Sequence, residues 1–475
     1  ANASRCPGNI RVRVSMEVVA GDCTYTLYAG SIFRARVRRI HTSRQKSTAS
    51  VLRLSHNIPH MESPQTDPVV PVVVPAEVLP IPMVPWWQRY WYWLLIAGMI
   101  VVLGVVLMAL GGTTEPVTPA QSEPFVIGAI VSLTGDAASF GIPIRQAADL
   151  AVKELNETGG IAGRPVEIRW EDGKCEPEDA RAGAERLLAA GDLSVLLAGG
   201  CSGEFLAAAP LAQAKNVISI SSSATNPDIS KLGKMVFRSV PSDALAGQVA
   251  AEYALTKFNA QSAAIIAEDK SYTLGLRKVF TENFTNGGGT IVSDAVFQTG
   301  TIDFSTIAAQ IAAANPSVVY LLPQTPTPGI LAVKALTDAG FTGKILTAEV
   351  LLIRDAIEEQ GAVLEGVTGI EVYFDEQNPN AIDFMHRFEE TYALEAAYPV
   401  FMTGIYDLLY LIAEAAEATD GSTIAIANYL YEIPEWDGAL GKLSFTPSGD
   451  ALLPFAIRTI NNREAPIVDT YTVSE

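Results

Sequence analysis

The pattern of hydrophobic and polar residues changes at Pro124, and from there onward short apolar runs alternate with amphipathic segments. The apolar runs predict strands at 125–132, 166–170, 193–198, 217–221, 263–266, 317–322 and 344–346. The amphipathic segments predict helices at 144–156, 177–190, 244–258, 274–284, 304–314 and 329–339. Because strands that alternate with helices form parallel sheets covered on both faces, the predicted fold class is α/β.

The length of this alternating region indicates more than one core. It spans roughly 350 residues, which is large for a single sheet of this kind. We therefore expect two lobes, each built on its own parallel sheet.

A different pattern occupies residues 90–110, which run for 21 residues without a charged side chain. At about 1.5 Å per residue, a helix of this length crosses a hydrocarbon layer of about 30 Å. Aromatic rings favour the headgroup layer, and they crowd the N-terminal end of this segment. These rings belong to Trp86, Trp87, Tyr90, Trp91, Tyr92 and Trp93. The segment is therefore predicted to be a transmembrane helix.

The charges on either side of this segment predict its orientation. Arg89 and ten Lys or Arg among residues 1–60 precede it, whereas none follows until Arg145. By the positive-inside rule, the N-terminus is cytoplasmic and residues 113–475 face outward. The alternative is a cleavable signal peptide, whose apolar region usually runs about 7–15 residues. We expect an uncleaved, single-pass membrane anchor.

The rest of the N-terminal region has the composition of disordered segments and linkers. Residues 1–60 have a net charge of +8 and no sustained apolar period, so we predict them to be disordered, an extension before a natural start at Met61. A basic arm that binds anionic lipid is the alternative. Seven prolines between residues 62 and 85 predict an extended cytoplasmic spacer over residues 61–89. Residues 111–123 form a second, polar linker.

Composition excludes several classes of function. The chain has 52 Asp and Glu against 33 Lys and Arg, and phosphate neutralisation needs clustered cations, so no nucleic-acid partner is expected. The four cysteines, Cys6, Cys23, Cys175 and Cys201, show no C-x-x-C spacing. His386 is the only histidine after residue 60. We therefore expect neither a metal site nor a Ser-His-Asp triad.

Three glycine-rich stretches, at 135–141, 159–163 and 199–203, do not match a cofactor motif. None has the G-x-G-x-x-G spacing of a dinucleotide fold. The first stretch follows a strand but lacks the Lys-Ser/Thr ending of a phosphate-binding loop. We expect no cofactor.

Two polar loops follow neighbouring predicted strands. Residues 199–203 end one strand and start a helix, and residues 221–227 end the next strand. Ligands of open parallel sheets bind beyond the carboxyl ends of strands, where helix N-termini offer free N–H groups. The loops therefore suit a carboxylate. The alternative is that Ser202 and Thr225 only cap helices.

A series of short motifs occurs in order after Pro124. It includes Ile-Gly at 127–128, Ser-Leu-Thr-Gly at 132–135, Asn-Glu-Thr-Gly-Gly-Ile-Ala-Gly at 156–163, Glu-Asp at 171–172 before Cys-Glu-Pro at 175–177, Gly-Cys-Ser at 200–202, Ser-Ser-Ala-Thr-Asn-Pro at 222–227, Phe-Arg-Ser-Val-Pro-Ser-Asp at 237–243 and Gly-Lys-Leu-Ser-Phe at 441–445. This ordered set resembles the type I periplasmic solute-binding proteins of ABC transporters, in the leucine/isoleucine/valine-binding branch. The resemblance covers residues 124–475.

The resemblance implies the two-lobed type I periplasmic-binding-protein fold, preceded here by one transmembrane helix. Its two doubly wound parallel-sheet lobes close by hinge motion. The three hinge crossings are expected near Val240, Val372 and Lys442. Lobe 1 is then expected at 124–240 and 373–441, and lobe 2 at 241–372 and 442–475.

The resemblance also implies a solute-binding site between the lobes. Ser202, Ser223 and Thr225 would hold the carboxylate of a solute, with Ala224 between them in the same loop. Glu349 of the other lobe would bind its ammonium group. An amino acid carries both groups.

Three further positions match residues around the cleft of the family. Tyr272 corresponds to an aromatic residue that lines the cleft, and Phe140 to one beside its opening. Gln324 stands where branched-chain members have a tyrosine, which leaves the side-chain pocket open. Without the resemblance, ordinary core or surface packing explains these three residues equally well.

We also predict a disulfide between Cys175 and Cys201. Each follows a strand end on adjacent α/β units, and the domain is expected to face an oxidising exterior.

The expected function is that of an extracytoplasmic receptor that captures a branched-chain or related amino acid and delivers it to an ABC permease. A ligand-sensing ectodomain and a binder of an amide, urea or organic acid are the alternatives. An enzyme is not expected, because the sequence displays no activated nucleophile or acid–base pair.

Overall fold

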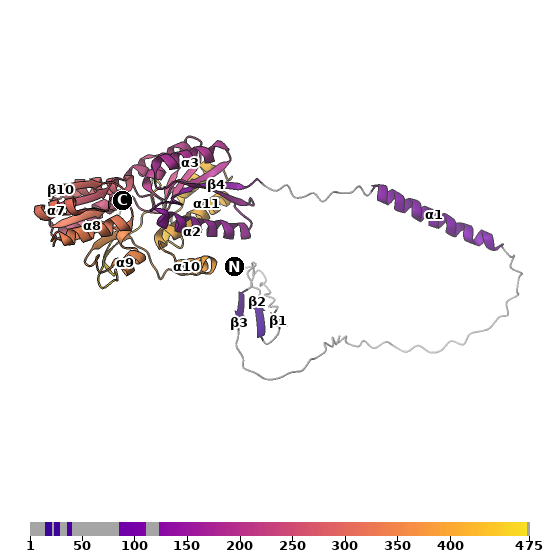
Figure 1. Ribbon diagram of the computed structural model, residues 1–475. Helices are drawn as coiled ribbons and strands as arrows, with labels where there is room; N and C mark the ends of the chain where they lie inside the picture. Colours follow the sequence, from indigo (N-terminus) through magenta and orange to yellow (C-terminus); the bar gives the residue numbers. More distant parts are fainter. Residues whose placement is uncertain (1–14, 21–22, 29–35, 40–84, 111–122, 473–475) are drawn as a thin grey trace, which may run out of the picture. The chain divides into compact units, whose positions relative to one another are not determined.

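The computed structural model describes residues 15–20, 23–28, 36–39, 85–110 and 123–472 (Figure 1). The chain divides into two units, Ala1–Gly112 and Thr113–Glu475, which are described separately.

The N-terminal unit corrects one prediction. Residues 1–60 were predicted to be disordered, yet they contain an antiparallel three-stranded sheet in the order β1-β2-β3. The strands are β1 (Ser15–Ala20), β2 (Cys23–Tyr28) and β3 (Arg36–Arg39). The sequence of β2 is rich in Thr and Tyr, which favour strands, but the high net charge of the segment masked this signal.

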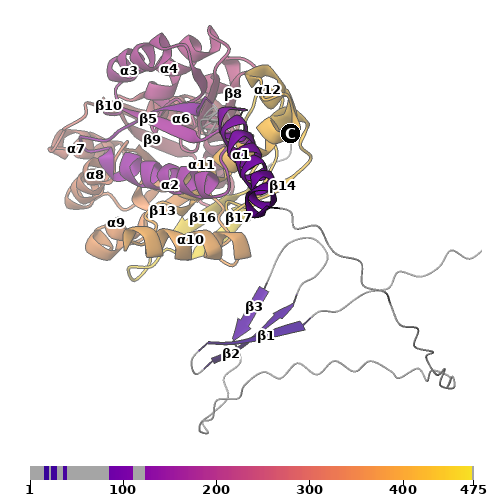
Figure 2. The same cartoon turned by 90° about the vertical axis from the view of Figure 1, so that its right-hand side faces the viewer.

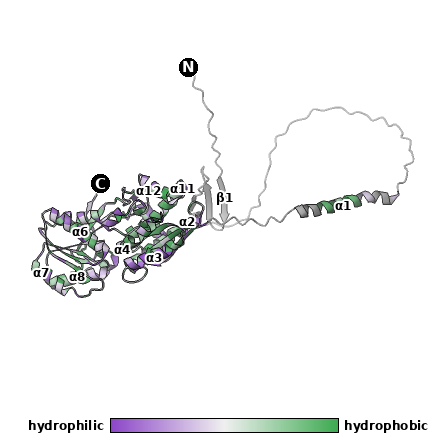
Figure 3. Cartoon of the chain, turned by 90° about the horizontal axis from the view of Figure 1, so that it is seen from above, coloured by the Kyte–Doolittle hydropathy of each residue, from purple (hydrophilic) through white to green (hydrophobic). Residues whose placement is uncertain are grey.

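Helix α1 (Trp86–Leu110) contains the predicted membrane segment. The side chains described in its middle are exposed and largely hydrophobic (Figure 3). Among the described residues, the only helix long and apolar enough to span a membrane is α11 (Pro399–Ala418), and 78% of its most apolar window is buried inside the protein. Helix α11 is therefore a core helix, and the transmembrane role of α1 stays a prediction.

The second unit starts with a parallel five-stranded sheet in the order β5-β4-β6-β7-β8. Its strands are β4 (Phe125–Val131), β5 (Val166–Asp172), β6 (Leu193–Leu197), β7 (Ile218–Ser221) and β8 (Val236–Arg238). All seven residues of β4 are buried, as expected for a central strand covered on both faces.

Seven helices surround this sheet, and Figure 1 shows α2, α3 and α11 around β4. They are α2 (Ala138–Glu157), α3 (Pro177–Ala189), α4 (Ser202–Gln213), the short 3-10 helix η1 (Pro227–Lys231), α10 (Pro379–Tyr392), α11 and α12 (Thr423–Glu432). The chain then forms a small hairpin from β14 (Trp436–Asp437) and β15 (Lys442–Leu443). Sheet, helices and hairpin make up the first lobe.

The second lobe has a seven-stranded sheet in the order β10-β9-β11-β12-β13-β16-β17. Its strands are β9 (Ser262–Glu268), β10 (Thr290–Phe297), β11 (Val318–Leu322), β12 (Lys344–Ala348), β13 (Thr368–Val372), β16 (Phe455–Thr459) and β17 (Ile467–Tyr471). The first five strands in this order are parallel, β16 pairs antiparallel with β13, and β17 pairs antiparallel with β16. Figure 2 labels β13, β16 and β17 close together.

The helices of the second lobe pack beside this sheet, with α7 and α8 near β10 in Figure 1. They are α5 (Asp243–Thr256), α6 (Ser271–Asn286), α7 (Ser305–Ala314), α8 (Pro326–Asp338), the 3-10 helix η2 (Glu349–Leu351) and α9 (Arg354–Gln360). The structure thus has the predicted α/β class and two lobes with parallel sheets.

The chain passes between the lobes three times. Two passages follow β8 and β13, near the predicted positions Val240 and Val372. The third comes later than the predicted Lys442, because Asp450 still pairs with Arg238 of the first lobe before β16 begins.

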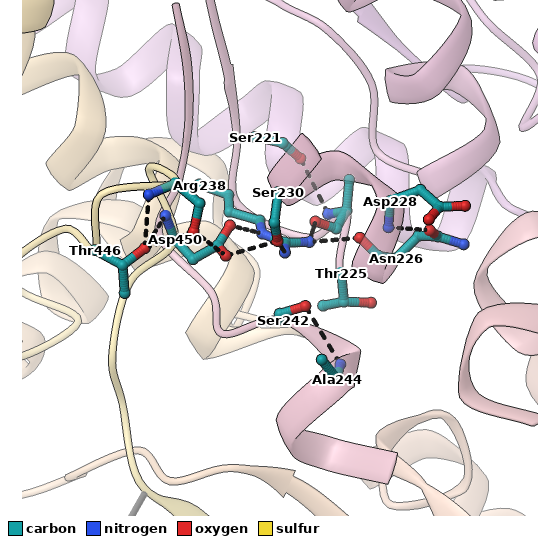
Figure 4. A network of polar contacts seen from close by, with 12 residues as sticks. Ser221, Thr225, Asn226, Asp228, Ser230, Arg238, Ser242, Ala244, Thr446 and Asp450 are labelled. Atoms are coloured by element: carbon teal, nitrogen blue, oxygen red, sulfur yellow. Dashed lines mark hydrogen bonds and ion pairs between the residues drawn. The ribbon is translucent and has the colours of Figure 1, made fainter. Parts of the chain in front are cut away.

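A buried ion pair holds this last passage in place. Arg238, which has no exposed surface, donates from Nε to Asp450 Oδ1 at 2.6 Å. Its Nη1 donates to the carbonyls of Ala224 and Asn226 at 3.1 and 3.0 Å, and its Nη2 to Ser230 Oγ at 2.8 Å (Figure 4). One guanidinium group therefore joins two loops that lie more than 200 residues apart in the chain.

We predict that Asp450→Asn lowers the free energy of unfolding by about 3 kcal/mol, because it leaves a buried guanidinium without its counter-charge. Urea denaturation followed by circular dichroism measures this loss. The matched control is Asp338→Asn, which removes an exposed i,i+4 partner of Lys334 and should change the free energy by less than about 0.5 kcal/mol. Equal, small effects of the two variants would contradict the role assigned to Arg238.

Candidate functional site

The carboxyl ends of β6 and β7 bring two predicted loops together. Ser202 is the first residue of α4, and its Oγ accepts hydrogen bonds from the backbone N–H groups of Thr225 and Asn226 at 3.2 and 3.1 Å. Ser202 itself is buried, 2% exposed, and is not among the residues that line the cavity described below. Thr225 Oγ1 is buried without a hydrogen bond of good geometry, and its hydroxyl group interacts with the nearby carboxyl group of Asp243.

Glu204, which the sequence analysis did not single out, fixes the loop before Ser202. Its buried carboxylate accepts from the backbone N–H groups of Cys175, Gly200 and Cys201 at 2.8–2.9 Å. Ser132 Oγ donates to the same carboxylate at 3.1 Å. The sequence signal was a glutamate at the third position of a helix, the place from which it caps the helix N-terminus.

A disulfide covers the same loop. Cys175 and Cys201, the predicted pair, are joined with their Cα atoms 5.4 Å apart. The start of α4 is therefore held both by a covalent bond and by the Glu204 carboxylate.

Ser223 and Ala224 have different roles from those implied by the resemblance. Ser223 Oγ donates to the carbonyl of Gly200 at 2.7 Å, so its proton is already used within the loop. The carbonyl of Ala224 accepts from Arg238. In this structure both residues shape the loop that presents Ser202 and Thr225.

The second lobe contributes two carboxylates. Glu349 begins η2 directly after β12, and Tyr272, near the start of α6, donates its hydroxyl to Glu349 Oε1 at 2.9 Å. Asp243 begins α5, is 3% exposed, and its Oδ2 has no hydrogen-bond partner in the described structure. Neither carboxylate forms an ion pair with any described residue. The sequence analysis missed Asp243 because a Ser-Asp pair at a helix start is also an ordinary cap.

Burial changes the protonation of these two acids. It raises the pKa of Glu349 to about 7, despite the hydrogen bond from Tyr272. Burial, together with the nearby charge of Glu349, raises the pKa of Asp243 well above its ordinary value. A cationic group placed between them would reverse both shifts, because an opposite charge favours the ionised form.

A cavity of about 390 Å³ joins these groups. Thr225, Asp243 and Glu349 line it, with residues from both lobes. It therefore brings the hydroxyl group of Thr225 and two carboxyl groups to one partly open space. Such a space suits a ligand that carries a cationic group.

The other two predicted residues lie around this cavity. The ring of Phe140 packs 4.5 Å from the ring of Tyr398, a cavity-lining residue. Gln324 does not line the cavity, and its side-chain amide lies 4.0 Å from Cys201 Sγ on the opposite lobe.

The two lobes contact each other near the start of α6, which packs against α4 of the first lobe. Lys270 Nζ forms an ion pair with Glu176 Oε1 at 2.6 Å, and Asn226 Nδ2 donates to the carbonyl of Ser271 at 2.6 Å. Within the described residues, no group of three or more His, Cys, Asp or Glu side chains is arranged to hold a metal ion.

Two α/β lobes with ligand-facing groups at the carboxyl ends of their strands define a solute-binding protein of the two-lobed class. A family model described as periplasmic binding protein matches residues 124–464, so the chain belongs to this family. Within it, the relatives identify a type I protein of the branched-chain amino acid group, as predicted.

Three relatives illustrate the similarity. The chain is 26% identical over 336 residues to Leu/Ile/Val-binding protein homolog 3 of Brucella melitensis, covering 70% of this chain and 90% of that protein. The leucine binding protein LivK of Thermotoga maritima has a TM-score of 0.66 and 25% identity, covering 73% of this chain and 99% of that chain. A solute binding protein of an ABC transporter from R. palustris, solved with benzoate, has a TM-score of 0.66 at 19% identity over 74% of this chain and 98% of that chain, a likeness of fold alone.

Family membership has two general consequences. The family consists of solute-binding receptors, so no enzymatic activity is expected. It also places the two-lobed domain outside the cytoplasm.

We predict that the raised pKa of Glu349 makes the stability of the ligand-free protein depend on pH. Between about pH 4.5 and 7, the folded protein holds a proton on Glu349 that the unfolded chain has released, so the free energy of unfolding falls as the pH rises. The fall attributable to this group is up to roughly 3 kcal/mol. Urea denaturation at pH 5 and pH 8 measures it, with Glu349→Gln as the reference. Parallel pH profiles for the two proteins would contradict the prediction.

Proposed function

We propose that this protein is the receptor of an ABC transporter that captures an α-amino acid between its two lobes and presents it to a permease. The observation that carries the proposal is the pair of carboxyl groups that line the interlobe cavity without a charged partner among the described residues, the buried Asp243 and the partly buried Glu349.

The two ends of an amino acid match the two sides of this site. Its ammonium group would lie between Asp243 and Glu349 and supply the missing positive charge. Its carboxylate would lie beside the hydroxyl group of Thr225, the lining residue of the loop that Ser202 holds through two backbone N–H groups. The N-terminus of α4 begins at Ser202, and its helix dipole favours an anion nearby. Tyr272 would keep Glu349 in place through its 2.9 Å hydrogen bond.

The same carboxylates disfavour the alternative of an organic acid. A benzoate-like solute, such as the one bound by the R. palustris protein, has no cation for Asp243 and Glu349. Its own negative charge would be repelled wherever either group is ionised, and it would supply no charge that stabilises the ionised forms. An amino acid therefore fits the site better than an organic acid does. The names of two relatives, a Leu/Ile/Val-binding protein homolog and a leucine binding protein, also refer to amino acids.

The direct test is Glu349→Gln, which keeps the size of the side chain and removes its charge. Loss of a charge-assisted contact should weaken amino-acid binding by roughly 1.5–3 kcal/mol, measured by titration calorimetry. The matched control is Glu359→Gln, an exposed position of α9 outside the cavity, which should bind as the wild type does.

Two results would overturn the proposal. One is wild-type affinity in Glu349→Gln. The other is equally tight binding of the deaminated acid, which would show that the ammonium group contributes nothing.

We further propose that α1 anchors the receptor in the membrane, with the N-terminus in the cytoplasm. Two features support this: residues 90–110 carry no charge, and the described apolar side chains of α1 are exposed, for example Leu94 at 74%. Exposed apolar surface of this kind is costly in water and favourable in lipid.

Fractionation of cells tests the anchor. The full-length protein should stay in the membrane fraction after a high-salt wash, and a variant with Leu94, Ile100 and Leu103 replaced by Asp should move to the soluble fraction, because central charges oppose insertion. A wild-type protein released by salt, or a mature protein that starts after residue 110, would contradict this orientation and anchoring.

A further inference from the structure

The cavity continues well beyond the residues assigned to the ammonium and carboxylate groups. Most of the remaining wall is apolar, and seven of its apolar side chains keep 9% or less of their surface exposed. They are Leu352, Ile357, Ile370, Phe374, Tyr398, Phe401 and Phe455. A solute held by its polar groups at Glu349 would therefore direct its side chain into an apolar chamber.

Aromatic rings form much of this chamber. The rings of Tyr398 and Phe401 are nearly parallel, with their centroids 6.1 Å apart, and Phe140 packs behind Tyr398 at 4.5 Å. Phe374 and Phe455 add two more rings from the second lobe. Aromatic walls interact best with another ring placed against a face or an edge.

The size of the cavity exceeds what a branched-chain side chain fills. An apolar protein cavity of about 150 Å³ is enough to hold benzene, with its six carbon atoms. The cavity here measures about 390 Å³, and because this volume includes the polar end at Thr225, Asp243 and Glu349 it must be compared with a whole amino acid. Leucine has nine non-hydrogen atoms, which at the volume per atom of the benzene cavity would need roughly 225 Å³. With leucine bound, much of the wall would lack contacts and lose the dispersion energy that close packing supplies.

The charged residues of the wall do not favour a polar side chain. Five of the charged lining residues are exposed to solvent: Arg354, Glu358, Glu376, Arg463 and Glu464. Arg458 is already paired with Glu371 at 2.5 Å. Asp243 and Glu349 are thus the lining carboxyl groups that are shielded from water and lack a charged partner among the described residues.

We propose that the solute is an α-amino acid with a large apolar side chain of six or more carbons, with aromatic side chains preferred. This inference rests on the proposed function, since it takes Asp243 and Glu349 as the site of the ammonium group.

The first experiment uses the wild-type protein and calorimetry with a series of straight-chain α-amino acids. The series is 2-aminobutyrate, norvaline, norleucine, 2-aminoheptanoate and 2-aminooctanoate, with leucine and phenylalanine for comparison. Each methylene that enters the chamber should tighten binding about fourfold, and the gain should continue past norleucine to 2-aminooctanoate. Phenylalanine should bind at least tenfold more tightly than leucine.

The second experiment fills the chamber. Val400, a partly exposed lining residue of α11, is replaced by Phe. Val400→Phe should weaken phenylalanine binding at least tenfold and change 2-aminobutyrate binding less than twofold, because the small side chain does not reach the filled space. The control is Val296→Phe on β10, which is 42% exposed and outside the cavity, and which should alter neither affinity.

The outcomes separate this inference from the proposed function. An affinity that peaks at leucine or norleucine and falls beyond it would overturn the inference and leave the amino-acid receptor intact. Equal weakening of both amino acids by Val400→Phe would also overturn it. Failure of every amino acid in the series to bind would refute the proposed function, and the inference would fail with it.

Discussion

The structure of the site depends on how one buried cation is satisfied. Arg238 has no access to water, and it exchanges its hydration for Asp450, Ser230 and the carbonyls of Ala224 and Asn226. A buried charge is stable only when hydrogen bonds and an opposite charge replace its lost hydration. A shift of the guanidinium group that breaks one of these bonds would therefore strain the others as well. The loop that carries Thr225 is consequently fixed to the chain segment that leads into the second lobe.

Most polar groups around the loop at residues 221–227 of the first lobe form hydrogen bonds within that lobe. Ser223 donates to Gly200, Glu204 accepts three backbone N–H groups, and Ser202 accepts two more. Such internal satisfaction leaves few groups without partners, and among these the ones at the cavity are Thr225 Oγ1 and Asp243 Oδ2. Preorganisation of this kind lowers the entropic cost of binding, because the loop is already ordered before a solute arrives.

Sequence patterns predicted the elements with the strongest periodicity and missed those with weak signals. Strands such as β4 and β11 are fully buried and read as continuous apolar runs. Strand β10 alternates between exposed and partly buried residues, and β8 has only three residues, so neither gave an apolar run. Of the site residues that the resemblance named, Thr225 and Glu349 line the cavity and Ser202 does not, and their role in binding stays a prediction. Asp243 resembled a helix cap, and the hydrogen bond from Ser223 to the Gly200 carbonyl depends on loop geometry that no sequence pattern encodes.

The chemistry of the cleft follows from the fact that its two acids lack cations and are shielded from water. Burial raises the pKa of both Glu349 and Asp243, and the charge of Glu349 further opposes the ionisation of Asp243. A bound ammonium group removes that opposition, so a solute with this group gains from the same feature that destabilises the ionised empty site. In the proposed function, selectivity for charge would be set at this end of the cavity, and the apolar wall around Phe374 and Tyr398 would set selectivity for shape. Because the two ends would act on different parts of the solute, a substitution at one end would leave the contacts at the other end in place.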